Sequence, residues 1–163
     1  MKHDYHGVNW DNKLVLGIPV IDNQHRNLWR MSNKFFAFGN DNGETSSWIF
    51  NETAHKAAEY LRSHFITEEK IMILINYERF FDHKKHHEDL LRNIDMETSM
   101  IPGKQNMVPD RFAYFFKDWM LSDISMHDRK MTECIHNMKE FGKFGMIFSS
   151  YLPQEEIYET VAI

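Results

Sequence analysis

The sequence predicts an all-α protein, an up-down-up-down four-helix bundle with an N-terminal arm and a C-terminal extension. Apolar residues recur at the three- and four-residue spacing of an α-helix in four long segments. Short segments rich in turn residues separate them. The 163-residue chain has only 7 Gly and 4 Pro, which favours long helices over tight turns. Four amphipathic helices joined by short connections typically form such a bundle.

The first two helices are predicted from about Pro19 and from Ser46 or Ser47. Proline suits the first turn of a helix, and Asp22 near that start complements the helix dipole. The turn-rich run FGNDNGETSS ends the first helix near Gly39. In the second helix the apolar positions have the same phase as His64 and Glu68. We therefore expect both of these polar side chains to face the core.

A turn at Asn76 and Tyr77 is expected to fold the third helix back along the second. The third helix begins at about Asp82, a natural N-cap, and points His83 and His87 inward. After the break SMIPGKQNMVP, a fourth helix begins at Pro109 and continues toward Gly142. The predicted organisation is an arm over 1–17, the bundle over 18–142, and a tail or linker over 143–163.

Bulk properties exclude several classes of function. A net charge of -5 gives no basic surface, so we expect no nucleic-acid partner. No run approaches the roughly 18 apolar residues that cross a membrane, so we expect no membrane association. The single cysteine, Cys134, excludes an internal disulfide and fits a reducing compartment. The start, MKHDYHGVNW, lacks the apolar segment of a secretion signal, so we expect a cytoplasmic protein.

The stretch HFITEEKIMILINYERFFDHKKHH contains two pairs of possible metal ligands. His64 and Glu68 are four residues apart, as are His83 and His87, so each pair lies on one helix face. Imidazole and carboxylate together favour iron, zinc or manganese. Burying so many ionisable groups is costly unless a cation compensates them. The full set on predicted inward faces is His25, His64, Glu68, His83, His87, Asp123 and Asp128.

A different di-iron pattern, Glu-x-x-His, occurs twice in the chain, at Glu52/His55 and at Glu133/His136. With this many histidines and glutamates, about one such match is expected by chance. His55 is also out of phase with the apolar face of its helix, so it is expected to face solvent. We therefore disfavour this alternative.

The spacing of these residues resembles a known family. Trp10 precedes GIPVIDNQH, which ends at His25, and HFITEEKIM follows from His64. Tyr77, the His83-x3-His87 pair and Trp119 complete the pattern in order. Over residues 8–135 the chain resembles the hemerythrins, specifically the bacterial hemerythrin-like domains. The resemblance implies a four-helix bundle with a non-haem di-iron centre that binds O2 reversibly or senses it.

The resemblance also implies a role for each residue. His25 and His64 hold one iron, where O2 binds, and His83 and His87 hold the other. Glu68 and Asp128 bridge the two irons, together with an oxygen from solvent. The apolar O2 pocket is expected at Leu28, Trp119, Met120 and Ile124.

One position departs from the family pattern. A histidine is expected four residues after Trp119, as a third imidazole on the second iron, but the residue there is Asp123. Asp128 follows five residues later, so a local bulge is needed to bring both to one face. Asp123 could bind iron, water could replace it, or His127 could substitute for it. We favour Asp123, because a carboxylate is a competent hard ligand for iron.

A carboxylate ligand adds negative charge and so favours ferric iron, which suits an O2 or redox sensor better than a carrier. The leading hypothesis is therefore an O2-sensing domain. Its tail could connect to a C-terminal output domain in a longer protein, or could be a terminal segment packed on the bundle. One alternative is an O2 carrier or store. The other is a di-iron enzyme that activates O2 or reduces peroxide or NO; the predicted apolar wall of the site argues against it.

Overall fold

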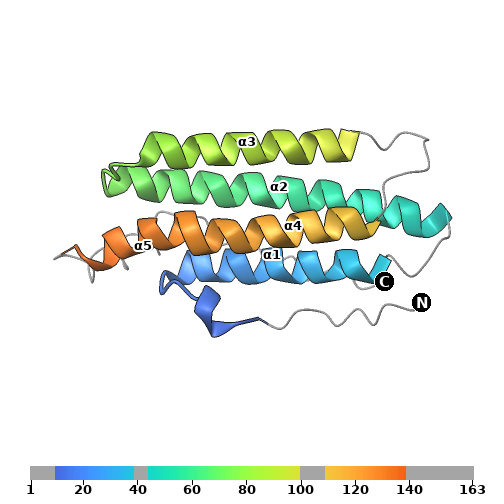
Figure 1. Cartoon of the computed structure of the whole chain (residues 1–163), viewed down its shortest axis with the longest axis horizontal. Helices are drawn as coiled ribbons and strands as arrows, with labels where there is room; N and C mark the ends of the chain where they lie inside the picture. The colour runs from blue at the N-terminus through green and yellow to red at the C-terminus, as the bar shows by residue number, and fades with distance from the viewer. Residues whose placement is uncertain (1–9, 39–43, 100–108, 139–163) are drawn as a thin grey trace.

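The computed structural model describes residues 10–38, 44–99 and 109–138, and within these ranges every long element is a helix (Figure 1). The long helices are α1 (Pro19–Phe38), α2 (Glu44–Leu74), α3 (Phe80–Ser99) and α4 (Pro109–Asp123). Their axes are nearly parallel, and each helix runs opposite to the one before it (Figure 1). The predicted all-α four-helix bundle is therefore confirmed. No helix of the described residues is both long and apolar enough to cross a membrane.

The fourth helix continues past Asp123 through one wider turn. A π-helical turn, η2 (Ile124–Asp128), leads directly into α5 (Arg129–His136). A π-turn accommodates one extra residue within a continuous helix. The bulge predicted between Asp123 and Asp128 is thus present. The helix was expected to continue toward Gly142 but ends at His136, with Asn137 as its C-cap. Residues 139–142 and the expected tail over 143–163 lie outside the described residues.

The observed start of α3 corrects one prediction. Asp82 lies in the first turn of α3 and is not its N-cap, because the helix already begins at Phe80. The reason is the compact turn after α2. Asn76 has φ 50°, and the amide of Tyr77 donates to the carbonyl of Met72 at 2.9 Å, the pattern of a helix that ends on a left-handed residue. The chain therefore reverses within a few residues. The second helix also begins earlier than expected, at Glu44.

Hydrogen bonds attach the end of the N-terminal arm to α1 and to α5. The carboxylate of Asp22 accepts hydrogen bonds from the amides of Leu16 (2.7 Å) and Gly17 (3.0 Å), which caps the entry to α1. The His136 Nε2 atom lies 2.8 Å from the carbonyl oxygen of Leu16, and Arg129 donates to the carbonyl of Lys13. These contacts hold residues 13–17 of the arm against α1 and α5.

An aromatic cluster fills the bundle at the end where α1 finishes and α4 begins. Phe35 packs edge-to-face on Phe50, Phe112 and Phe116, with ring centroids 5.7, 4.9 and 5.4 Å away. Its side chain is fully buried. Such contacts add to the free energy of burying apolar surface. The cluster joins α1, α2 and α4 and keeps their spacing fixed.

Replacing Phe35 by alanine tests the contribution of this cluster. Phe35→Ala should lower the free energy of unfolding by about 3–5 kcal/mol, because it leaves a cavity between three helices. Phe81→Ala is the matched control, since Phe81 is 82% exposed and its loss should change stability by at most about 0.5 kcal/mol. Urea unfolding followed by circular dichroism measures both. Equal effects of the two substitutions would contradict the assignment of the core.

Candidate metal centre

Seven ionisable side chains meet in the interior of the bundle, and the sequence predicted all seven to face inward. Each is at most 3% exposed. They come from α1, α2, α3, the end of α4 and η2, so five elements of the chain build the site. The seven residues are His25, His64, Glu68, His83, His87, Asp123 and Asp128.

Six of the seven form two groups that could each hold a metal ion. The first group is His25, His64, Glu68 and Asp128, and the second is Glu68, His83, His87 and Asp128. Within each group the donor atoms lie within 4.8 Å of one another. Both groups contain the same two carboxylates. The arrangement therefore offers two neighbouring ion positions with two ligands in common.

Each shared carboxylate directs one oxygen to each group. Oε1 of Glu68 lies 3.6 Å from Nε2 of His64, whereas Oε2 lies 3.2 Å from Nε2 of His87. Oδ2 of Asp128 lies 3.2 Å from Nε2 of His25, whereas Oδ1 lies 3.2 Å from Nε2 of His83. A carboxylate in this orientation can bridge two metal ions. The geometry thus supports a dinuclear centre with both acids as bridges.

The π-turn sets the direction of Asp128. On a regular α-helix a five-residue step turns well away from the starting face, yet Asp123 and Asp128 are both buried. The wider turn absorbs that difference. His127, the residue before Asp128, is only partly buried and belongs to neither group.

Two of the buried imidazoles, His64 and His87, are in the charge state that binds metals. Burial, with the repulsion of His25, lowers the pKa of His64 to about 3. Burial, with the repulsion of His83, lowers the pKa of His87 to about 2. Both rings are therefore neutral at pH 7. A neutral imidazole has a free lone pair, so a metal ion does not have to displace a proton there.

The pKa values of the two shared carboxylates, Glu68 and Asp128, shift in opposite directions. Burial, followed by the charge of Asp128, raises the pKa of Glu68. Burial alone would also raise the pKa of Asp128, but its contacts with His25 and His83 hold that pKa well below its usual range. None of the carboxylate oxygens of Glu68 and Asp128 has a hydrogen-bond partner within the described residues. Cations would compensate these buried acids, so the side chains fit a pair of metal ions.

A buried glutamine that the sequence analysis missed orients one ring of the first group. Oε1 of Gln24 lies 2.9 Å from Nδ1 of His64, and its Nε2 donates to Thr67 at 3.1 Å. This amide favours the tautomer that leaves Nε2 of His64 free for a metal. The available signal was a polar residue on the apolar face of α1, three positions after Ile21.

The second group has a charged neighbour instead. Oε1 of Glu69 lies 3.5 Å from Nδ1 of His87, and its Oε2 accepts from Lys84 at 2.7 Å. The sequence analysis assigned no role to Glu69 or Lys84. Carboxylate partners of this kind make a metal-bound imidazole a stronger ligand. A neutral amide therefore contacts a histidine of the first group, whereas a carboxylate contacts a histidine of the second.

Asp123 lies beside the second group but outside both groups of donor atoms. Its Oδ1 is 3.1 Å from Nε2 of His86, a residue that the sequence analysis missed. Burial, with the charge of Asp128, raises the pKa of Asp123 to about 6. The His86 ring stacks on His127, with centroids 3.9 Å apart and planes at 8°. Iron binding by Asp123 remains a prediction, as does the substitution by His127.

The four residues expected to line an O2 pocket are all in the bundle interior or next to it. Leu28, Met120 and Ile124 are each 1% exposed, and Trp119 is partly buried. The Trp119 ring meets Phe65 edge-to-face, and Phe65 stacks on His87 with centroids 3.8 Å apart. These contacts join Trp119 to His87 through Phe65. An O2 pocket lined by the four residues remains a prediction.

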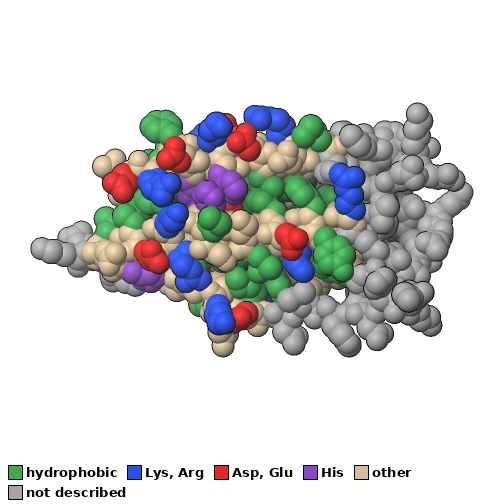
Figure 2. All heavy atoms as spheres, viewed as in Figure 1, with side chains coloured by type: hydrophobic (Ala, Val, Ile, Leu, Met, Phe, Trp, Pro, Cys, Tyr) green, Lys and Arg blue, Asp and Glu red, His purple; other side chains and the backbone are tan. Residues whose placement is uncertain are grey.

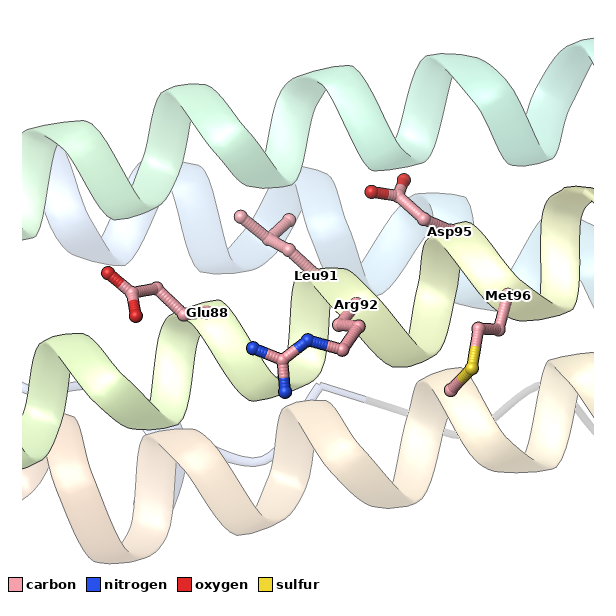
Figure 3. A pocket seen from close by; sticks show the side chains of 5 residues that line it. All are labelled: Glu88, Leu91, Arg92, Asp95 and Met96. Atoms are coloured by element: carbon pink, nitrogen blue, oxygen red, sulfur yellow. The ribbon is translucent and has the colours of Figure 1, made fainter.

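The outer face of α3 carries a shallow pocket, distinct from the metal centre (Figure 3). The charged residues along it have partners on the surface: Asp95 pairs with Arg62, and Arg92 lies 3.1 Å from Asp89. The pocket is therefore a solvated helix surface. Its lining residues are Glu88, Leu91, Arg92, Asp95 and Met96.

Replacing Glu68 by glutamine separates metal binding from folding. Glu68→Gln should abolish the binding of two metal ions, because it removes the acid common to both groups. The pKa of Glu68 is raised from 4.5, so the folded chain keeps a proton that the unfolded chain releases as pH increases. The free energy of unfolding of the metal-free wild type therefore falls as the pH rises above about 4.5. Urea unfolding should show Glu68→Gln gaining stability relative to wild type between pH 5 and 7.

Glu78→Gln is the control, since Glu78 is exposed in the turn before α3. It should keep both metal ions, as counted by plasma emission spectrometry, and leave the pH dependence unchanged. Full metal content in Glu68→Gln would overturn the bridging assignment.

Comparison with known proteins places this geometry in a family. No family model matches the sequence. The chain is similar to a hemerythrin chain of Sipunculus nudus, with 31% identity over 122 residues, or 74% of this chain and 87% of that protein. It is 25% identical to a bacteriohemerythrin of Clostridium acetobutylicum over 74% of this chain and 95% of that protein. A bacteriohemerythrin of Pseudomonas aeruginosa is 28% identical over 82% and 86%. The chain belongs to the hemerythrin family.

Proposed function

We propose that the chain is a di-iron domain that binds O2 at the iron held by His25 and His64. The observation that carries this proposal is the pair of carboxylates, each with one oxygen directed to each donor group. Imidazole and carboxylate ligands suit iron. Membership of the hemerythrin family supports the same metal and ligand.

The polar side chains of the site would hold the metals, and the apolar side chains would keep water away from them. When bound, a pair of ferrous ions would supply the electrons that reversible O2 binding needs. His25 and His64 would hold one ion, the one to which O2 binds, whereas His83 and His87 would hold the other. The apolar side chains of Leu28, Met120 and Ile124 exclude water and protons, which favours the return of O2 over its loss in a reduced form.

The substitution at Asp123 favours a sensor of O2 or redox state. We assign Asp123 to the iron held by His83 and His87, in place of a third imidazole. Its carboxylate adds negative charge to a dry interior, which stabilises ferric over ferrous iron. The reduced protein should then oxidise readily in air, a property that suits sensing and works against oxygen transport or storage. Peroxide and NO are small enough to use the same position.

A metal count combined with an optical spectrum in air tests the di-iron assignment. We expect two irons per chain and a near-ultraviolet band from an oxygen bridge between them. One metal per chain, or zinc, would contradict the proposal. Turnover of a substrate, rather than uptake of one O2 per centre, would instead favour a di-iron enzyme.

Stopped-flow oxidation of the reduced protein tests the role of Asp123. Asp123→His should oxidise about 10-fold more slowly than wild type, because a neutral ligand stabilises ferric iron less. Asp118→His is the control, since Asp118 is exposed and lies five residues earlier on α4; this variant should oxidise like wild type. If Asp123→His oxidises as fast as wild type or faster, Asp123 does not tune the centre.

A further inference from the structure

The buried carboxylate of Asp123 takes its partner from a neighbouring helix. Asp123 is 1% exposed, and neither oxygen has a hydrogen bond of ordinary geometry within the described residues. It makes an ion-pair contact with His86 on α3, whose Nε2 lies 3.1 Å from Oδ1 of Asp123. A charged carboxylate in such a place requires a compensating donor or cation.

Helix α3 carries three histidines at the centre, and only two of them belong to a donor group. His83 and His87 are four residues apart and belong to the second donor group. His86 lies three residues after His83 on the same side of the helix. Its Nε2 is directed at Asp123 and it belongs to neither donor group. His86 is therefore placed to act on the centre through Asp123 rather than to bind a metal itself.

The His86 ring is held in a defined orientation. It stacks nearly parallel on His127 of η2, with centroids 3.9 Å apart. Its side chain is 29% exposed, and histidine side chains reach the surface between α3 and α4 (Figure 2). The π-turn thus does two things: it points Asp128 into the centre and places His127 against the ring that contacts Asp123.

We propose that His86 is a positioning residue, which holds Oδ1 of Asp123 so that the other oxygen is available to the iron bound by His83 and His87. This inference rests on the proposed di-iron function. A hydrogen bond from outside the ligand set is the usual support of a carboxylate that binds a metal. The interaction needs only the tautomer with a proton on Nε2, so a neutral ring suffices. His86 and Asp123 together then occupy the place of one histidine in the family pattern.

Release of iron from the reduced protein to the ferrous chelator ferrozine tests this proposal. His86→Phe keeps a ring to stack on His127 but cannot donate to Asp123. One of the two irons should leave about 10-fold faster than in wild type, while the other leaves at the wild-type rate. His86→Gln restores a donor and should return the release rate close to that of wild type. His55→Phe, at an exposed histidine of α2, is the matched control and should not differ from wild type.

A double-mutant cycle shows whether His86 acts through Asp123. Asp123→Asn should itself speed the release of one iron, and adding His86→Phe to it should produce no further increase. The proposal is overturned if His86→Phe releases iron like His55→Phe, or if its effect is unchanged beside Asp123→Asn. Circular dichroism identifies a variant that has not folded, and His86→Gln then decides.

The outcomes separate this proposal from the proposed function. If wild type does not hold two irons, the di-iron function itself fails. If wild type holds two irons and binds O2 while His86→Phe behaves as the control, only the role of His86 fails.

Discussion

The structure depends on the burial of two acids, Glu68 and Asp128, between two sets of imidazoles. Each acid offers one oxygen to each set, and the pKa of Glu68 is raised by its burial and by the charge of Asp128. An arrangement like this is unfavourable in a bare protein interior and favourable around cations. The packing of the helices therefore has to keep these two buried acids close together.

Rigid packing on both sides of the centre meets that requirement. The cluster around Phe35 fixes the spacing of α1, α2 and α4 at one end. At the other end, Asp22 and His136 attach the N-terminal arm to α1 and α5. The π-turn between α4 and α5 then corrects the direction of Asp128 within an otherwise continuous helix. Because the ligands come from helices and not from loops, their positions are set by the packing.

The two halves of the centre differ in their surroundings. The first half is buried, and the neutral amide of Gln24 orients His64. The second half has two charged supports, Glu69 with Lys84 beside His87 and Asp123 with His86 near the surface. Anionic groups near a metal favour its higher oxidation state. The two donor groups thus share their bridging acids but differ in the charge of the residues around them.

The sequence alone determined the helices, the inward faces and the seven ionisable residues, because a period of 3.6 residues reports which side chains share a face. It also required a bulge between Asp123 and Asp128, since five residues do not fit a regular turn. Only the tertiary structure decided what these residues meet. The contacts of His86 with Asp123 and of Gln24 with His64 join different helices, and periodicity within one helix carries no information about contacts between two. For the same reason α3 begins at Phe80: the turn at Asn76, not the capping preference of Asp82, sets its start.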